Sequence, residues 1–200
     1  MSKYFKNEAY IFSIDTVKEC LKMANVCLTT AQSQCPQNVY GMASVILLTS
    51  AIDIMGAYYE NGVFKPERLN KIGKKENVRS HFEAFFDILM STQDKSALKD
   101  KGTFVSIVYE GMRCKSVHNG QLRPKIYIIN QDNDKTWIEQ NKKTTKYECY
   151  NIYLPEFIRI IEKASHTLEK MLNTENVETS NDYNFSSNTG LTNSISAKYI

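Results

Sequence analysis

The sequence lacks an apolar run long enough to cross a membrane. The longest candidate, residues 42–52, falls well short of the roughly 18 to 20 residues that span a bilayer, and it is better explained as a buried helix. The first eight residues also lack the apolar stretch and the small-residue cleavage site of a secretory signal. We therefore expect a soluble, cytoplasmic protein with no membrane partner.

Paired cysteines and glycine-rich loops are missing as well. The chain has five cysteines, but none forms a Cys-x-x-Cys pair and no Cys/His set has the spacing of a zinc site. The glycines are scattered and form no phosphate-binding loop. These absences predict free thiols that serve as small buried hydrophobes, no metal site and no cofactor. The cysteines are Cys20, Cys27, Cys35, Cys114 and Cys149.

What is present is an ordinary globular composition with an uneven charge. The 200 residues are 42% hydrophobic and 24% charged, which suits one domain with a core of its own. The net charge is +3, and residues 174–200 carry −2, which leaves +5 on the rest of the chain. This charge is compatible with a polyanionic partner but is too weak to argue for one.

Helical periodicity dominates the first part of the chain and returns at its end. Apolar residues recur at spacings of three and four in each segment, and Ser13 is a candidate N-cap for the first one. Residues 62–75 between the second and third segments are typical of a loop. The predicted helices cover about Ser13–Gln34, Gln37–Glu60, Glu76–Thr92, Lys101–Asn119 and Pro155–Leu172.

After Pro124 the helical spacing of the apolar residues is lost, and the residues that follow predict strands. Residues 125–129 and 147–154 are rich in β-branched and aromatic residues, and residues 136–139 are a candidate middle strand. The fold class is therefore mainly α, with a small antiparallel β insertion at about 124–154 before the last helix. Residues 1–172 form the domain, and 173–200 are an Asn/Ser/Thr-rich tail that we expect to be disordered.

The segment Tyr109–Gly120 concentrates the residues best suited to chemistry. Arg113 and His118 are separated by four residues near the end of a predicted helix, and Gly120 suits the position after its C-terminus. Five residues correspond to about 140° of rotation on an α-helix, so at least one of the two side chains must face solvent, a cleft or another subunit. Arginine binds phosphate with a fork of donors, and histidine exchanges protons near neutral pH. The two together could cleave RNA without a metal.

Structural roles for the same residues remain open. His118 could interact with the last carbonyls of its helix, and Arg113 could form an ion pair with Glu110. His81 and His166 have no partner at a useful spacing, and we expect both on the solvated surface. The tyrosines at 147, 150 and 153 could stack on bases, although packing of the strands against a helix is the more common use.

The run Tyr109-x-x-x-Arg113-Cys114-x-x-x-His118-x-Gly120 resembles the signature of the HEPN superfamily, Arg-x(4–6)-His late in a four-helix bundle. The resemblance spans roughly residues 14–172, but only residues 109–120 carry a specific motif. It implies an up-down helical bundle that forms a homodimer, with the two motif copies facing each other across the interface.

The function implied by this resemblance is metal-independent RNA cleavage, in a toxin–antitoxin, phage-defence or RNA-processing system. Arg113 would then stabilise the phosphate and His118 would act as base or acid, with Asp53, Tyr109 and Cys114 in support. Active members usually have Asn, Asp or another polar residue where this chain has Cys114. Other branches are non-catalytic modules that bind RNA, a nucleotide or a protein such as an antitoxin, and this alternative stays open.

Overall fold

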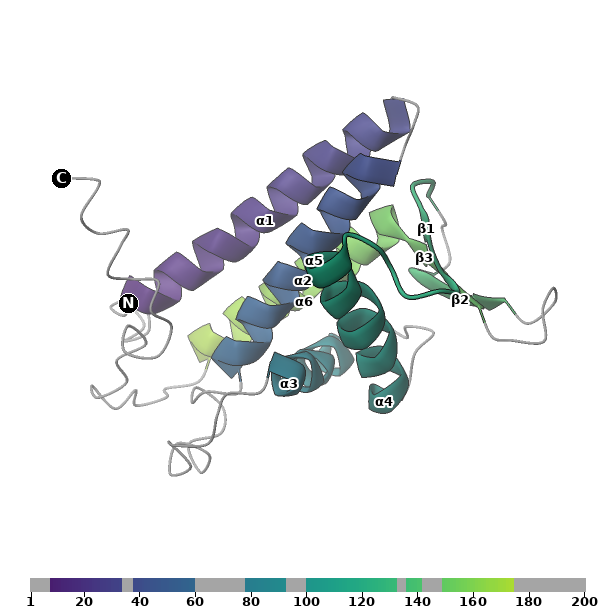
Figure 1. The fold of residues 1–200 in the computed structure, drawn as a ribbon. Coiled ribbons are helices and arrows are strands. Elements are labelled where there is room, and N and C mark those ends of the chain that lie inside the picture. The colour runs from purple at the N-terminus through teal and green to yellow at the C-terminus, as the bar shows by residue number, and fades with distance from the viewer. Residues whose placement is uncertain are drawn as a thin grey trace.

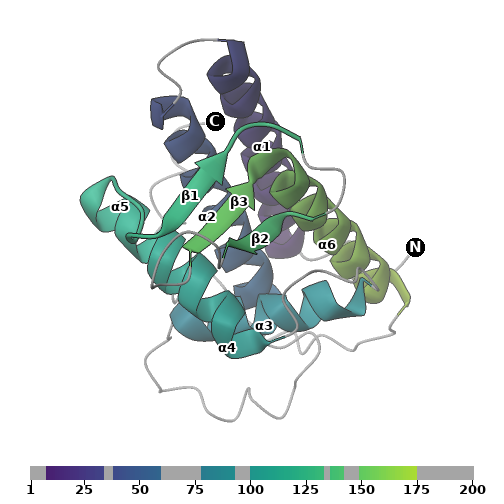
Figure 2. The same cartoon turned by 90° about the vertical axis from the view of Figure 1, so that its right-hand side faces the viewer.

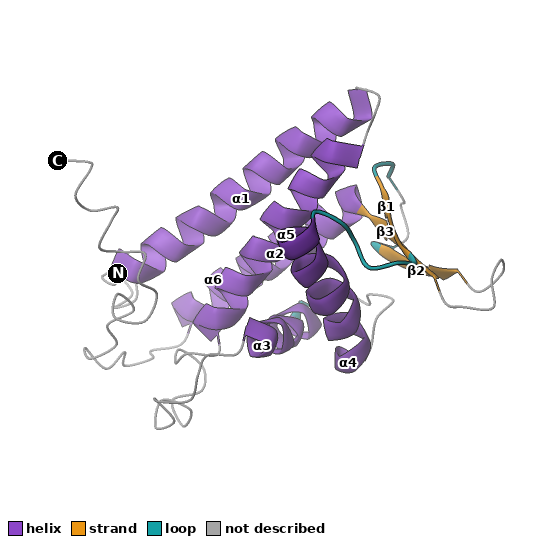
Figure 3. Cartoon of the chain, in the orientation of Figure 1, coloured by secondary structure: helices purple, strands orange, loops and turns teal. Residues whose placement is uncertain are grey.

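The computed structural model of the chain is mainly helical and describes residues 8–33, 38–59, 78–92, 100–132, 136–141 and 149–174. Its helices are α1 (Glu8–Ser33), α2 (Asn38–Tyr58), α3 (Val78–Ser91), α4 (Lys101–Phe104), η4 (Val105–Cys114), α5 (Lys115–Asn119) and α6 (Leu154–Thr174). Its strands are β1 (Ile126–Ile129), β2 (Ile138–Asn141) and β3 (Cys149–Tyr153). Figures 1 and 3 show α1, α2 and α6 as long helices side by side, with the strands at one end of the bundle.

α2 is the central helix. It packs against α1, α3, α6 and η4, and Val45, Leu48 and Ile52 are fully buried. The expectation that no apolar run is long enough to cross a membrane was wrong, because Tyr40–Tyr58 is long and apolar enough by length and composition, although half of it is buried inside the fold. An apolar surface on nearly every side is what a helix surrounded by other helices requires, so α2 is explained as the central helix of the bundle.

The segments α4, η4 and α5 follow one another without a break and form one continuous helix, Lys101–Asn119. Asp100 is its N-cap, with a carboxylate oxygen that accepts hydrogen bonds from the backbone N–H and the hydroxyl of Thr103, both at 2.6 Å. Its middle part, the ten residues of η4, has the wider π-helical turn in which hydrogen bonds join residues five apart. Gly120 ends it in the left-handed conformation (φ 61°), as predicted, and its N–H donates to the carbonyl of Ser116.

The strands form one sheet whose order differs from the sequence order. β3 lies in the centre, paired parallel with β1 and antiparallel with β2 (Figure 2). The predicted antiparallel pairing is confirmed for β2 and β3 but is wrong for β1 and β3, and β3 rather than residues 136–139 is the middle strand. β3 is central because it is the strand that buries Cys149 and Ile152, whereas β2 exposes Glu139 and Gln140, which suit an edge.

A cluster of aromatic rings joins this sheet to the helices. The Trp137 ring stacks on Phe157 of α6 with the ring centroids 4.9 Å apart, and it meets Phe104 of α4 edge-on at 6.3 Å. Trp137 is almost completely buried. The β insertion is thus part of the core rather than an appendage.

The helix boundaries match the predictions with one exception. α1 begins at Glu8, so Ser13 lies within the helix and is not its N-cap. No proline or glycine occurs between Glu8 and Ser13, so nothing in the sequence stops the helix at the predicted start. The predicted loop at 62–75 and all of the tail after Thr174 lie outside the described residues.

Candidate functional site: an arginine held by a bridging aspartate

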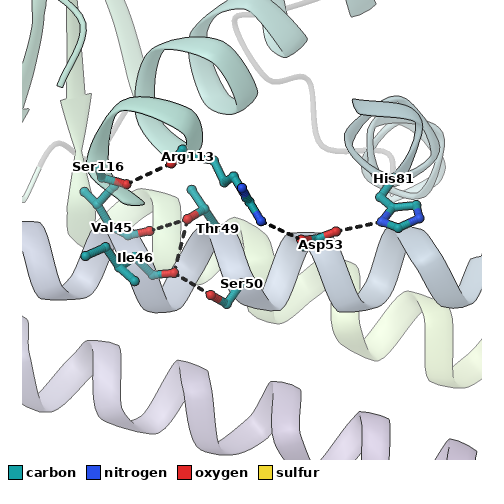
Figure 4. A network of polar contacts seen from close by, with 8 residues as sticks. All are labelled: Val45, Ile46, Thr49, Ser50, Asp53, His81, Arg113 and Ser116. Atoms are coloured by element: carbon teal, nitrogen blue, oxygen red, sulfur yellow. Dashed lines mark hydrogen bonds and ion pairs between the residues drawn. The ribbon is translucent and has the colours of Figure 1, made fainter. Parts of the chain in front are cut away.

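Arg113 lies at the end of η4 and points toward α2. Its Nη2 is 3.5 Å from Oδ2 of Asp53, and a quarter of the arginine side chain is exposed (Figure 4). The sequence had left a pairing with Glu110 open, but Glu110 instead contacts Arg79 at 2.8 Å and Arg123 at 3.9 Å. Asp53, the predicted supporting residue, is therefore the partner of Arg113.

Asp53 has a second partner that the sequence did not indicate. Nδ1 of His81 donates to Oδ1 of Asp53 at 2.7 Å, so one carboxylate joins α3 to η4 through α2 (Figure 4). His81 is buried, and the prediction that it lies on the solvated surface was wrong. A signal existed in the sequence: His81 is three residues after Val78 and four before Phe85, on the stripe that α3 turns inward.

Close packing of the backbone brings His81 to Asp53. Gly56 of α2 lies against α3 so tightly that a Cβ atom there would be 1.9 Å from the carbonyl oxygen of His81. Only glycine allows this approach, because it carries no side chain. The position of the histidine therefore depends on a glycine one turn beyond Asp53.

Tyr109 and Cys114 form a second contact beside Arg113. Burial raises the pKa of the Tyr109 hydroxyl, and a hydrogen bond to the Cys114 side chain raises this pKa further, since both favour the protonated form. The two residues are five apart, which is the spacing that the π-helical turn of η4 brings onto one face. The Tyr109 ring also contacts Phe82 of α3, with the ring centroids 5.1 Å apart.

His118 stands apart from this cluster. It lies in α5, after the helix has returned to α-helical geometry, and it is exposed to solvent. This agrees with the expectation that Arg113 and His118 cannot both point into one core. The structure thus brings together Asp53, Tyr109, Arg113 and Cys114, adds His81, and leaves His118 on the surface about one turn further along the same helix.

The other predicted features can be located as well. His166 is exposed on α6, as predicted, and its Nδ1 is 3.4 Å from Glu169. Cys20, Cys27, Cys114 and Cys149 are free thiols. The prediction of buried thiols is confirmed for Cys149 but was wrong for the other three, which are half-buried; Cys35 lies outside the described residues. Within the described ranges, no group of three or more His, Cys, Asp or Glu side chains could hold a metal ion.

The electrostatic arrangement suits an anion. The guanidinium of Arg113 offers five N–H donors, and the Asp53 carboxylate lies 3.5 Å from one of its nitrogens, Nη2. The remaining donors can bind a phosphate that approaches from the exposed side. No protein-family model, curated protein or solved structure matches this chain.

Proposed function

We propose that the chain is a metal-independent, RNA-cleaving HEPN-like protein that acts as a homodimer. The observation that supports this best is the Asp53–Arg113 ion pair, which holds a partly exposed guanidinium at 3.5 Å beside the helix end that carries His118. A fixed cation and an exposed imidazole on one helix are the two groups that this reaction needs.

The reaction follows from the chemistry of these two groups. His118 withdraws the proton of a 2′-hydroxyl, and the 2′-oxygen attacks the adjacent phosphorus. The protonated His118 of one of the two copies then gives a proton to the 5′-oxygen as the bond between that oxygen and phosphorus breaks. Arg113 neutralises the additional negative charge that develops on the phosphoryl oxygens. The products are a 2′,3′-cyclic phosphate and a 5′-hydroxyl, and no electrons are transferred.

A second subunit would complete the site. Arg113 faces Asp53 and His118 faces solvent, so one copy of the helix does not direct both groups at the same phosphate. In the homodimer, His118 of one copy would act beside Arg113 of the other.

One observation favours a non-catalytic alternative, in which the same surface binds RNA, a nucleotide or a protein partner without cleavage. The Cys114 thiol stands where active family members carry a polar group, and it is engaged by the Tyr109 hydroxyl within its own helix. A thiol that accepts this hydrogen bond contributes little to orienting a phosphate.

The test is incubation of the purified protein with RNA in EDTA. Wild type is compared with Arg113→Ala, with His118→Ala and with His166→Ala, whose histidine is equally exposed but lies on α6. We expect the first two variants to be slower by about a hundredfold or more, and His166→Ala to equal wild type. The cleaved RNA should carry 2′,3′-cyclic ends.

Each result has a clear reading. Equal cleavage by all four proteins would identify a contaminant and overturn the nuclease proposal. Binding of RNA without cleavage, weakened by Arg113→Ala, would favour the non-catalytic alternative. A monomer in light scattering at concentrations where the protein is active would refute the shared site.

A further inference from the structure

A cleft lined by both apolar and polar side chains lies on the other side of the helix that carries Arg113. It has a volume of about 500 Å³, and its walls come from α4, η4, the loop before β1, and the strands β1 and β3. Figure 2 shows how the strands are arranged beside α4. This volume is in the usual range for small-ligand sites. Its walls include Ser106, Ile107, Arg123, Lys125, Ile126 and Tyr150.

The cleft is separate from the Arg113 cluster. A Cβ atom at Gly111 would be 2.3 Å from the Ile126 side chain, so Gly111 faces β1, whereas Arg113 faces Asp53 on α2. Residues two apart on a helix point in nearly opposite directions. The N–H of Arg123 donates to the carbonyl of Gly111 at 2.9 Å, which fixes the loop that forms the cleft to η4.

Two cations and a hydroxyl give the cleft its chemistry. The Arg123 side chain is half exposed, with Nη1 at 3.4 Å from the Ser106 hydroxyl and at 3.9 Å from Glu110. Lys125 is exposed two residues further on. Arg123 and Lys125 both contribute a positively charged side chain to the wall of the cleft, and such side chains bind phosphate.

An aromatic ring and apolar side chains form the rest of the wall. Tyr150 of β3 is half-buried there, beside Ile107 and Ile126. A flat ring next to cations matches a ligand that has both a planar base and a phosphate, because bases stack on aromatic side chains while phosphates bind the charges.

The backbone at Lys125 is a further sign of function. Its φ of 74° lies in the left-handed region, which a lysine adopts at a conformational cost and a glycine adopts freely. The turn is held by hydrogen bonds from Ile126 N–H to the Arg123 carbonyl (3.2 Å) and from Tyr150 N–H to the Lys125 carbonyl (2.8 Å). A strained position that carries a charged side chain is explained if the charge is needed there.

We propose that this cleft binds a phosphorylated nucleoside, with Arg123 and Lys125 on the phosphate and Tyr150 against the base. The nucleoside can be free or a unit of a single-stranded RNA. The proposal does not depend on RNA cleavage at Arg113 and His118, because binding in the cleft requires neither of these side chains.

The strained backbone allows a variant that separates binding from folding. Lys125→Gly removes the cation and relieves the left-handed strain, so we expect a melting temperature at or above that of wild type. The same variant should bind about tenfold more weakly, and Arg123→Gln should weaken binding by a similar factor. Lys125→Arg keeps the charge and should bind nearly as wild type does, and Arg159→Gln, which removes an exposed arginine of α6, serves as the control.

Binding is measured by fluorescence anisotropy in EDTA with two probes, a fluorescent AMP analogue and a labelled 2′-O-methyl oligoribonucleotide. The second probe lacks the 2′-hydroxyl that cleavage requires, so a failure of the nuclease proposal does not affect this measurement. Weaker binding of either probe to Lys125→Gly supports the proposal, and the probe that responds identifies the free or the chain-bound source. No binding of either probe to wild type, or equal binding to wild type and Lys125→Gly, would overturn it.

Discussion

Asp53 joins His81 and Arg113 through its two carboxylate oxygens, at 2.7 Å and 3.5 Å. The three residues come from α2, α3 and η4, which the chain brings together from positions far apart in the sequence. The hydrogen bond from His81 fixes the orientation of the half-buried Asp53 carboxylate, and this keeps its other oxygen directed at Arg113. His81 is therefore a positioning residue, which acts on the arginine only through Asp53.

The first prediction concerns this histidine. His81→Leu removes the donor to Asp53 and should lower the free energy of unfolding by about 1–3 kcal/mol, the usual range for a hydrogen bond to a charged group. His81→Asn places an amide N–H near the position of Nδ1 and should recover much of this loss. Urea unfolding measures both variants. Equal destabilisation by Leu and Asn would show that packing of the ring, rather than its hydrogen bond, stabilises the fold.

The second prediction concerns the glycine that lets α2 approach α3. Gly56→Ala would put a Cβ atom 1.9 Å from the carbonyl oxygen of His81, so the two helices must move apart. We expect a loss of about 3 kcal/mol or more, the upper part of the range for overpacked cores. The fluorescence of Trp137, the only tryptophan, can follow the unfolding.

A matched glycine provides the control. At Gly102, in the first turn of α4, the nearest atom to an added Cβ would be a carboxylate oxygen of Asp100 at 3.4 Å, an ordinary contact. Gly102→Ala should leave stability unchanged or raise it by up to about 1 kcal/mol, because alanine favours the helix. If Gly56→Ala and Gly102→Ala lost the same amount of stability, close packing of α2 against α3 at Gly56 would not explain the loss in Gly56→Ala.

Local signals in the sequence were sufficient for the helices but not for the sheet. The three-and-four spacing and Gly120 defined the helix 101–119, since periodicity and helix ends are properties of neighbouring residues. The parallel pairing of β1 and β3 depends on which strand is buried between the others. The sequence patterns that predict three consecutive strands do not indicate their order in the sheet or which pairs are parallel.

The candidate site shows the same limit. Asp53 was predicted as the residue supporting Arg113, and the structure places the two in contact. The pairing of His81 with Asp53 could not be predicted from local spacing, because the two residues are 28 positions apart and lie on different helices. The π-helical turn of η4, which brings Tyr109 to Cys114, has no sequence signal that we could have used.

The third prediction concerns the N-cap of the long helix at acidic pH. Hydrogen bonds from the Thr103 hydroxyl and from its backbone N–H hold the pKa of Asp100 below its ordinary value. A lowered pKa means that the stabilisation is present above about pH 3.9, the unfolded value, and is lost as the pH falls through the folded value. Asn is an equally good cap that does not titrate, so Asp100→Asn should show a flatter loss of stability in this acidic range. The check is thermal unfolding of both proteins from pH 6 downward; parallel curves would contradict the role of Asp100.

The last prediction concerns the contact between Tyr109 and Cys114 at alkaline pH. Burial and the hydrogen bond to Cys114 raise the pKa of Tyr109 above its ordinary value near 10. A raised pKa means that this stabilisation is complete below about pH 10, and it disappears as the pH rises through the folded pKa, because the unfolded chain releases the proton first. Tyr109→Phe cannot ionise at this position, so its free energy of unfolding should fall less steeply than that of wild type above about pH 10.

The measurement is urea unfolding of both proteins between about pH 8 and pH 11, which gives the slope of the free energy of unfolding against pH. The contributions of the other tyrosines and of the lysines are the same in both proteins, so they cancel when the two slopes are subtracted. Tyr58→Phe, which removes the hydroxyl of another buried tyrosine, on α2, is the control for the loss of a tyrosine hydroxyl in general. A wild-type slope equal to that of Tyr109→Phe would mean that the phenol and the thiol do not interact, and the case for Cys114 as an internally engaged group would fail with it.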